Sequence, residues 1–288
     1  MVKRSKSNES VKLKTNNERI SKNSKLSKDE SSISWCNYTY NPWQNCRKIS
    51  SGCRFCYMFR EKSRYGQDTS KVFKSAPATF NKPLNWDEQS LVFTCSWSDF
   101  FIEDADEWRA DAWAIIKETP HLTYQILTKR PERILEHLPK DWEKGYDNVW
   151  LGVSIENNDS KSRLHELVIV PSKVKFISAE PLLERLDFTQ EEMNILENHY
   201  HWLIIGGESG NDNGMHRYRP CELEWMEYLV DVGTKTHMPV FMKQLGTYLS
   251  KELGMRDRHA RNISELPENL RIQKFPESTP HEILDRMG

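Results

Sequence analysis

Short apolar runs of strand length recur along most of the chain, separated by loops or by segments with a helical pattern. An opening run at residues 33–40 is followed by LVFTC (91–95), LTYQIL (122–127), NVWLGVSI (148–155), KVKFIS (173–178), HWLIIGG (201–207) and PVFMKQL (239–245). Helical patterns cover residues 105–118, 131–138, 159–168 and 221–235. Strands that alternate with helices predict a parallel sheet, because a parallel crossover needs a connection long enough to hold a helix.

Polar or charged residues mark the carboxyl end of each later run. They are Ser96 to Asp99, Thr128 to Arg130, Glu156 and Asn157, Glu180, Glu208 and Ser209, and Lys243 and Gln244. Any one of them could be an ordinary loop residue or helix cap. The carboxyl ends of parallel barrel strands face one side of the fold, where active sites are built. We therefore predict an α/β fold with a (β/α) barrel, complete or incomplete, and one shared pocket. An open doubly wound sheet is the alternative.

Composition divides the chain into three parts. Residues 1–30 carry nine Lys and Arg against four acids, a net charge of +5 in a chain whose total is −1. With few apolar residues this segment predicts a disordered basic tail, either inert or a nucleic-acid-binding arm. Residues 31–246 are expected to form the barrel with an N-terminal cysteine loop. Residues 247–288 are expected to form an extension packed on the barrel, with a basic patch at residues 256–261 that is either solvated or a nucleic-acid contact.

The apolar pattern and the cysteines bear on the compartment. No apolar run approaches the roughly 20 residues of a membrane span, and the N-terminus lacks the apolar core of a secretory signal. Six cysteines in such a chain favour free thiols or metal ligands over disulfides. We expect a cytoplasmic protein without a membrane partner.

The strongest chemical signal is the pattern Cys46-x6-Cys53-x2-Cys56, with three thiols within eleven residues. This is a density typical of metal ligands. Three thiolates can hold a [4Fe–4S] cluster and leave one iron open, whereas a structural zinc site needs four closed ligands. Cys36, ten residues upstream of Cys46, is the first candidate for the fourth ligand of such a zinc site, ahead of Cys95 or a histidine. We predict a metal centre on Cys46, Cys53 and Cys56.

The segment CRFCY, with Phe55 before the last cysteine, resembles the end of the cluster motif of radical S-adenosylmethionine enzymes. In those enzymes the loop follows the first barrel strand and leads into the first helix, as residues 43–66 do here. Six residues separate the first two cysteines here, whereas three residues separate them in the usual motif. From about Ser34 to Pro276 the chain resembles a phage- and prophage-associated uncharacterised family with a three-cysteine motif and a similar barrel. The motifs are NPWQNCRKISSGCRFCY, SWSDFF, ILTKRPER, LGVSIEN, FISAEPLL, IIGGESG and FMKQLG.

The resemblance implies a [4Fe–4S] cluster and S-adenosylmethionine as cofactors. We assign cofactor binding to the strand-end residues Asp99, Glu156, Glu180, Glu208 and Lys243. Asp99 is the candidate for binding the ammonium group. Because Gly206 and Gly207 follow a late strand, we interpret them as allowing close approach of the backbone to a ligand. Three cations also lie at strand ends, namely Lys129, Arg130 and Lys243. They would bind a carboxylate or phosphate of a ligand, or form salt bridges with the acids at the same end of the barrel.

Two functions are compatible with the sequence. The first is a radical S-adenosylmethionine-type enzyme whose substrate is unknown, with a nucleic-acid base or nucleotide favoured by the phage setting. The second is a non-catalytic zinc-stabilised module that binds nucleic acid through the basic tail. A partner protein is compatible with either function.

Overall fold

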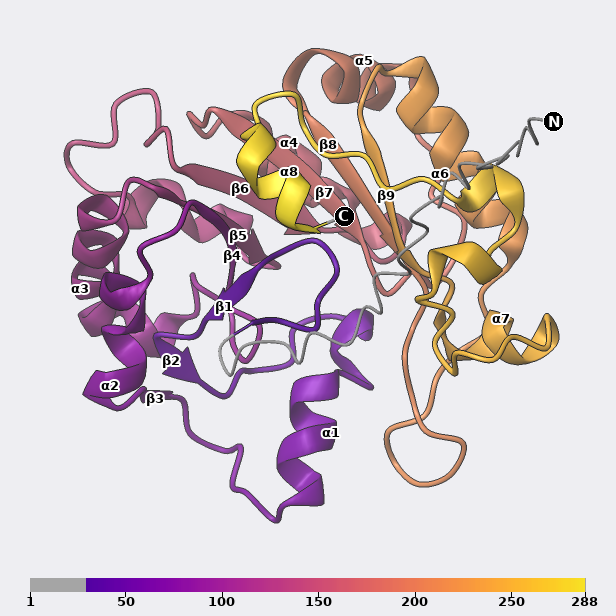
Figure 1. Ribbon diagram of the computed structural model, residues 1–288, viewed down its shortest axis with the longest axis horizontal. Helices are drawn as coiled ribbons and strands as arrows, with labels where there is room; N and C mark the ends of the chain where they lie inside the picture. Colours follow the sequence, from indigo (N-terminus) through magenta and orange to yellow (C-terminus); the bar gives the residue numbers. More distant parts are fainter. Residues whose placement is uncertain (1–29, 288) are drawn as a thin grey trace, which may run out of the picture.

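The computed structural model describes residues 30–287 (Figure 1). The predicted basic tail therefore lies outside the described residues, except for Glu30. Among the described residues no helix is long and apolar enough to span a bilayer.

Seven parallel strands form the central sheet, and their order in space is their order along the chain. They are β1 (Tyr38–Tyr40), β4 (Ser90–Thr94), β5 (Leu122–Thr128), β6 (Val149–Ser154), β7 (Val174–Ala179), β8 (Trp202–Gly206) and β9 (Val240–Gln244). The sheet curls, and no pairing between β1 and β9 closes it within residues 30–287. This confirms an α/β fold with an incomplete barrel. The doubly wound alternative is wrong, because that fold requires a reversal in strand order.

The outer face of the sheet packs against four helices, α3 (Asp106–Glu118), α4 (Ser162–Val168), α5 (Gln190–His199) and α6 (Leu223–Lys235). Side chains of a strand alternate between its two faces. On β6, Val149, Leu151 and Val153 join the cluster that contains these helices, whereas Trp150 joins a separate cluster on the inner face. The runs read as continuously apolar because both faces of the strands are covered.

Large aromatic side chains fill the inside of the half-barrel. Trp35, Phe93, Trp150, Phe176, Trp202 and Phe241 share the inner cluster. Gly152 lies against the Phe176 ring, where a Cβ atom would come within 2.4 Å of it. Ile283 of α8 (His281–Met287) is fully buried in the same cluster. The inner space is therefore a packed core and not a pore.

The C-terminal extension also covers the β9 edge of the sheet. Met242 N donates to Ile272 O at 2.7 Å, and Lys274 N donates to Val240 O at 2.9 Å. The extension thereby satisfies backbone groups that an uncovered edge strand would leave unpaired. Helix α7 (Gly246–Glu252) connects β9 to this extension.

Smaller elements precede β4. Strands β2 (Trp43–Gln44) and β3 (Phe73–Lys74) form an antiparallel pair, and α1 (Tyr57–Arg64) and α2 (Pro77–Phe80) lie between the first two sheet strands. Short 3₁₀ turns are at 51–53, 82–85, 103–105, 158–161, 263–265 and 268–270.

The helix predicted at 131–138 is wrong, since that segment forms the 3₁₀ turns Pro131–Arg133 and Leu135–His137. Helices α5 and α8 were missed. For α5 the sequence did hold a signal, because Thr189 and Glu192 form a capping box.

Candidate functional site

The cysteine loop, residues 45–56, lies at the mouth of the half-barrel. It follows β1 and β2 and leads into α1, in the order expected from the sequence. Cys46, Cys53 and Cys56 all line one cavity of about 900 Å³ at the carboxyl ends of the strands. The inner cluster forms its floor through Trp35 and Phe93.

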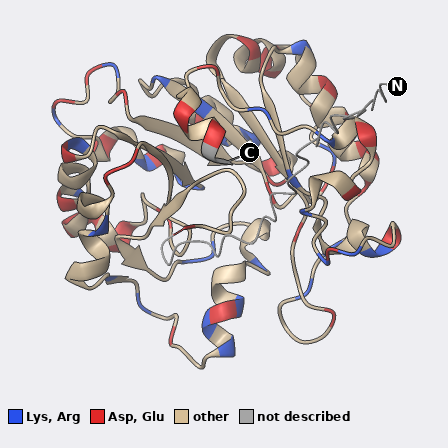
Figure 2. Ribbon diagram, in the orientation of Figure 1, with Lys and Arg blue, Asp and Glu red and all other residues tan. Residues whose placement is uncertain are grey.

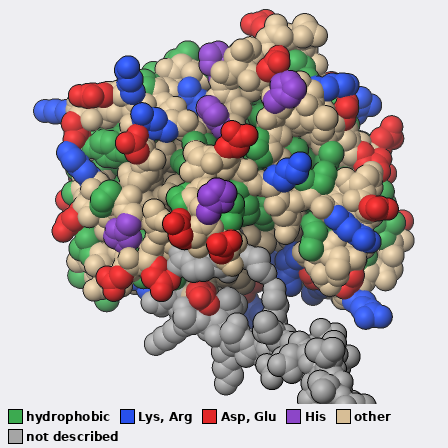
Figure 3. Space-filling view, turned by 45° about the horizontal axis from the view of Figure 1, so that its top comes forward, with side chains coloured by type: hydrophobic (Ala, Val, Ile, Leu, Met, Phe, Trp, Pro, Cys, Tyr) green, Lys and Arg blue, Asp and Glu red, His purple; other side chains and the backbone are tan. Residues whose placement is uncertain are grey.

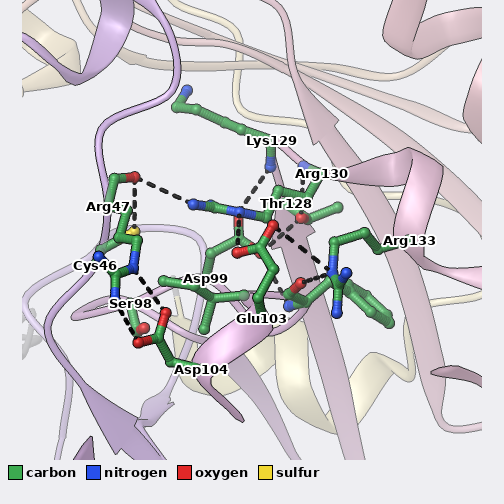
Figure 4. A network of polar contacts seen from close by, with 12 residues as sticks. Cys46, Arg47, Ser98, Asp99, Glu103, Asp104, Thr128, Lys129, Arg130 and Arg133 are labelled. Atoms are coloured by element: carbon green, nitrogen blue, oxygen red, sulfur yellow. Dashed lines mark hydrogen bonds and ion pairs between the residues drawn. The ribbon is translucent and has the colours of Figure 1, made fainter. Parts of the chain in front are cut away.

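Side chains from the loops that follow β4, β5 and β8 hold the backbone of the cysteine loop. Ser98 Oγ donates to the carbonyl of Asn45 at 2.5 Å, and Arg130 Nη2 donates to that of Arg47 at 3.2 Å. Arg219 Nη1 donates to the carbonyl of Ser51 at 3.0 Å. Arg47 itself forms an ion pair with Asp104 (Figure 4). The loop is therefore fixed relative to the sheet by contacts along its length.

Glu156 lies beneath the cysteine loop, fully buried, and is not part of the cavity wall. Its carboxylate accepts from Ser50 Oγ and pairs with Arg163 and, at 3.1 Å, with Lys129. Burial alone would raise the pKa of Glu156, but the charges of Lys129 and Arg163 and the Ser50 hydrogen bond lower it to about 2. Glu156 is thus an ionised support of the loop, and its contacts do not favour the predicted role in cofactor binding.

Gly52 allows this close packing of the loop on Glu156. A Cβ atom at Gly52 would lie 2.3 Å from Glu156 Cγ. Only glycine leaves room for the buried carboxylate directly under the loop.

The three thiols suit a cluster by their chemistry. Burial raises the pKa of Cys46 to about 12, with a further increase from Asp99 that Arg130 opposes, and burial also raises the pKa of Cys56. Cys46 and Cys56 can therefore share one protein cavity as neutral thiols without mutual repulsion, and metal binding would ionise them. Within residues 30–287, no three His, Cys, Asp or Glu side chains surround a single point as ligands of one ion. Three thiols from one loop are a donor set that fits an iron–sulfur cluster.

Cys36 is placed differently from the other three. It is buried in the inner cluster, its Sγ donates to Ile33 O at 3.7 Å, and it does not line the cavity. The four-cysteine zinc site is therefore not formed by the described residues. Cys95 lines the cavity from the end of β4, while Cys221 is buried in the outer cluster.

Asp99 is buried and surrounded by donors (Figure 4). It accepts from Thr128 Oγ1 at 2.6 Å, from the backbone N–H groups of Lys129 and Phe101 at 2.9 Å each, and it pairs with Arg130 at 3.3 Å. These contacts fix the loop after β4 and aim Arg130 at the cysteine loop. They leave Asp99 little capacity for the ammonium group predicted for it.

Glu180 and Glu208 line the cavity, each with its own cation. Lys243 Nζ lies 2.5 Å from Glu180 Oε1, and the two side chains are 20% and 17% exposed. Arg219 donates two hydrogen bonds to the Glu208 carboxylate, from Nε to Oε2 at 2.9 Å and from Nη2 to Oε1 at 2.5 Å. Of the predicted residues, the Glu180–Lys243 pair is the one that both faces the cavity and retains access to it.

The glycine pair after β8 packs closely against the chain itself. A Cβ atom on Gly207 would come within 2.1 Å of Leu245 O, and one on Gly206 within 2.9 Å of Glu180 Cδ. Gly207 also lines the cavity, and the expected approach of a ligand to this pair stays a prediction.

Several residues of the mouth were missed from the sequence. Ser154 and Ser178 are register partners at the ends of β6 and β7, and both line the cavity. Neither hydroxyl has a hydrogen-bond partner among residues 30–287. Strand alternation held a signal for Ser178, because it lies two residues before Glu180 on the same face. His259 and Arg261 of the extension also line the cavity, and no periodic pattern indicates them.

Comparisons with known proteins give one family and one distant structure. The model of the family described as "Protein of unknown function (DUF5131)" matches residues 30–276. No curated protein matches the chain. Among solved structures, the chain is similar to a spore photoproduct lyase mutant with a dinucleoside spore photoproduct, at 15% identity and a TM-score of 0.42. The match covers 63% of this chain and 58% of the other, so this chain matches less than two thirds of that protein's length.

Proposed function

This chain belongs to the family of proteins of unknown function DUF5131, and from its own site we propose that it is a radical S-adenosylmethionine-type iron–sulfur enzyme. One observation carries the proposal. The thiols of Cys46, Cys53 and Cys56, all from one loop, line a single cavity at the carboxyl ends of parallel barrel strands. Catalytic sites of such barrels lie at this end.

The cysteine loop would hold the cluster, and its anchors keep it in place. When bound, a [4Fe–4S] cluster with three protein thiolates leaves one iron for S-adenosylmethionine and supplies its reductive cleavage. Ser98, Arg130 and Arg219 fix the loop backbone, while buried Glu156 supports it from below. These contacts do not depend on the ligand, so the loop is positioned before the cofactor arrives.

The cavity wall offers groups for the bound molecules. Ser154 and Ser178 present two neighbouring hydroxyls that have no hydrogen-bond partner among residues 30–287, and they suit a polar edge of cofactor or substrate. The Glu180–Lys243 pair places one negative and one positive group beside them. The ring of Phe55, packed against the Arg219 guanidinium at 5.3 Å, covers part of the mouth and helps to exclude water.

The substrate and the compartment are part of the proposal. The resemblance to a phage- and prophage-associated family favours a nucleic-acid base or nucleotide. A reducing cytoplasm would keep the cysteines reduced and available to the cluster, and all six cysteines are free of disulfides.

Anaerobic purification tests the proposal. We expect a brown protein with iron and acid-labile sulfide that cleaves S-adenosylmethionine to methionine and 5′-deoxyadenosine when reduced by dithionite. A colourless protein that holds one equivalent of zinc and does not cleave S-adenosylmethionine would contradict the proposal. That result would favour the alternative of a zinc-stabilised binding module.

A further inference from the structure

The segment that carries the cysteines is strongly basic in an otherwise acidic body. Residues 46–82, which we call the basic lobe, contain nine Lys and Arg and only two acids, a net charge of +7. They comprise most of the cysteine loop, α1, β3 and α2, and Figure 2 shows blue segments along this part of the molecule. On the face seen in Figure 3, by contrast, acidic and basic side chains are interspersed. The lobe is therefore a local concentration of positive charge beside the cavity mouth.

Much of this charge is not neutralised by ion pairs within the part of the chain that the structure describes. Arg47 and Lys74 pair with Asp104 and Asp111, and Arg60 and Arg64 share Glu61. The remaining cations include four without an ion-pair partner among residues 30–287, namely Lys48, Arg54, Lys62 and Lys71. Partial burial lowers the pKa of Lys62, because no carboxylate compensates its ammonium group. A polyanion would supply the missing negative charge.

Aromatic rings are interleaved with these cations. Tyr65 and Phe73 are 69% and 47% exposed, although they are large side chains. Lys62 Nζ lies 5.7 Å from the centroid of Phe73 and 5.4 Å from that of a further ring, Trp97. Exposed rings beside unpaired cations are the combination that binds unpaired bases and their phosphates.

A second cavity lies between the basic lobe and the segment of β1 and β2. It has a volume of about 420 Å³, and its lining includes Lys62, Tyr65 and Gln67 of the lobe and Tyr40 and Gln44 of the strands. This side cavity shares Thr39, Glu61 and Trp97 with the main cavity, so these three residues separate the two. A chain lying in the side cavity would reach the cysteine-lined cavity across this wall.

We propose that the basic lobe binds single-stranded nucleic acid, with one nucleotide in the side cavity and its neighbour directed into the main cavity. The inference deepens the proposed function by assigning its substrate class, and it rests on that function only for the fate of the neighbouring nucleotide. Binding itself requires only the lobe. An acidic protein would satisfy the charges but would have no use for the exposed rings or for a cavity of nucleotide size.

Anisotropy of a fluorescent single-stranded oligonucleotide, titrated with the full-length chain at several salt concentrations, tests the proposal. Tyr65→Ala should weaken binding by about tenfold through lost base stacking. Lys62→Gln should lower the slope of log K against log salt by about 0.7, the value for one phosphate contact on a single strand. The matched control is Lys235→Gln on α6, which removes an equal charge and should change neither quantity.

Duplex binding, the lobe variants and competition by an acidic polymer separate the proposal from its alternatives. The same oligonucleotide in a duplex should bind more weakly, because paired bases cannot stack on Tyr65. Unchanged binding in both lobe variants would place the contact elsewhere, such as on the basic tail, and overturn the proposal. Equal competition by polyglutamate at matched charge would overturn it in favour of an acidic protein. The chain purified without iron should bind like the reconstituted one, so failure of the iron–sulfur proposal would leave this result standing.

Discussion

Each carboxylate predicted at the cavity mouth is held by its own cation. Asp99 pairs with Arg130, Glu156 with Lys129 and Arg163, Glu180 with Lys243, and Glu208 with Arg219. Several unpaired carboxylates in a partly buried site would be costly, since buried charges persist only with partners. The mouth is therefore a network of ion pairs, in which most acids position the cysteine loop and its flanking loops.

Glu156→Gln tests the support beneath the cysteine loop. The change leaves Lys129 and Arg163 without their shared buried anion, which should lower the free energy of unfolding by about 3–5 kcal/mol. Urea denaturation measures this loss in the free energy of unfolding. Glu191→Gln, at an exposed position of α5, is the control and should change stability by less than about 0.5 kcal/mol.

The same residue predicts a pH dependence. The folded-state pKa of Glu156 is lowered from 4.5 to about 2, so its ionised form contributes stability above pH 4.5. The difference is worth roughly 3 kcal/mol, which is lost as the pH falls from 4.5 towards 2. The stability gap between the unsubstituted chain and Glu156→Gln should narrow over this range. A gap that stays constant would show that the Glu156 charge is not what supports the loop.

At the residue scale, the sequence located the positions but not their tasks. Strand ends indicated Asp99, Glu180 and Lys243, because a run of apolar residues marks where each strand stops. The partners Arg163 and Arg219 follow Glu156 and Glu208 by 7 and 11 residues and lie in a helix and in an irregular segment. No local pattern shows which acid they will meet, so ligand-facing and structural acids could not be separated.

At the element scale, hydrophobic runs predicted all seven sheet strands, because strands buried on both faces leave a continuous apolar signal. The segment 131–138 has helical spacing but forms two 3₁₀ turns. Pro131 starts the first turn, and the side chain of Arg133 bonds to Phe101 O and Asp106. Tertiary contacts of this kind override a short periodic pattern.

Gly207→Ala tests the contact between the ends of β8 and β9. Its Cβ would lie 2.1 Å from Leu245 O, and a backbone atom cannot move aside as a flexible side chain can. We expect a loss of at least about 3 kcal/mol in the free energy of unfolding. Gly214→Ala is the control, since its Cβ meets nothing within 4 Å and only its φ of +86° opposes the change. That strain should cost about 1 kcal/mol. Equal losses in the two variants would contradict the close approach.

At the scale of the whole molecule, periodicity could not decide whether the barrel closes. Closure depends on whether β1 and β9 meet, and here the β9 edge pairs with residues 272–274 instead. The inner aromatic cluster and the C-terminal helix fill the space below the cavity. These long-range contacts leave no local trace in the sequence, which is why the role of α8 was missed.

Ile283→Ala tests the packing of α8 on the inner cluster. Ile283 is fully buried, so its truncation should lower the free energy of unfolding by about 2–4 kcal/mol. Ile169→Ala removes the same atoms from a side chain that is 66% exposed and should cost less than about 0.5 kcal/mol. Chemical denaturation of both variants gives the comparison. A small loss for Ile283→Ala would show that α8 does not complete the core.

The iron content of two cysteine variants after anaerobic reconstitution tests whether three cysteines hold the cluster. Cys53 lines the cavity with Cys46 and Cys56, whereas Cys36 is buried in the inner cluster. We expect Cys36→Ala to keep the iron and sulfide of the unsubstituted protein, and Cys53→Ala to lose them while it stays folded by circular dichroism. Equal loss of metal in both folded variants would establish a four-thiolate site and contradict the three-cysteine cluster.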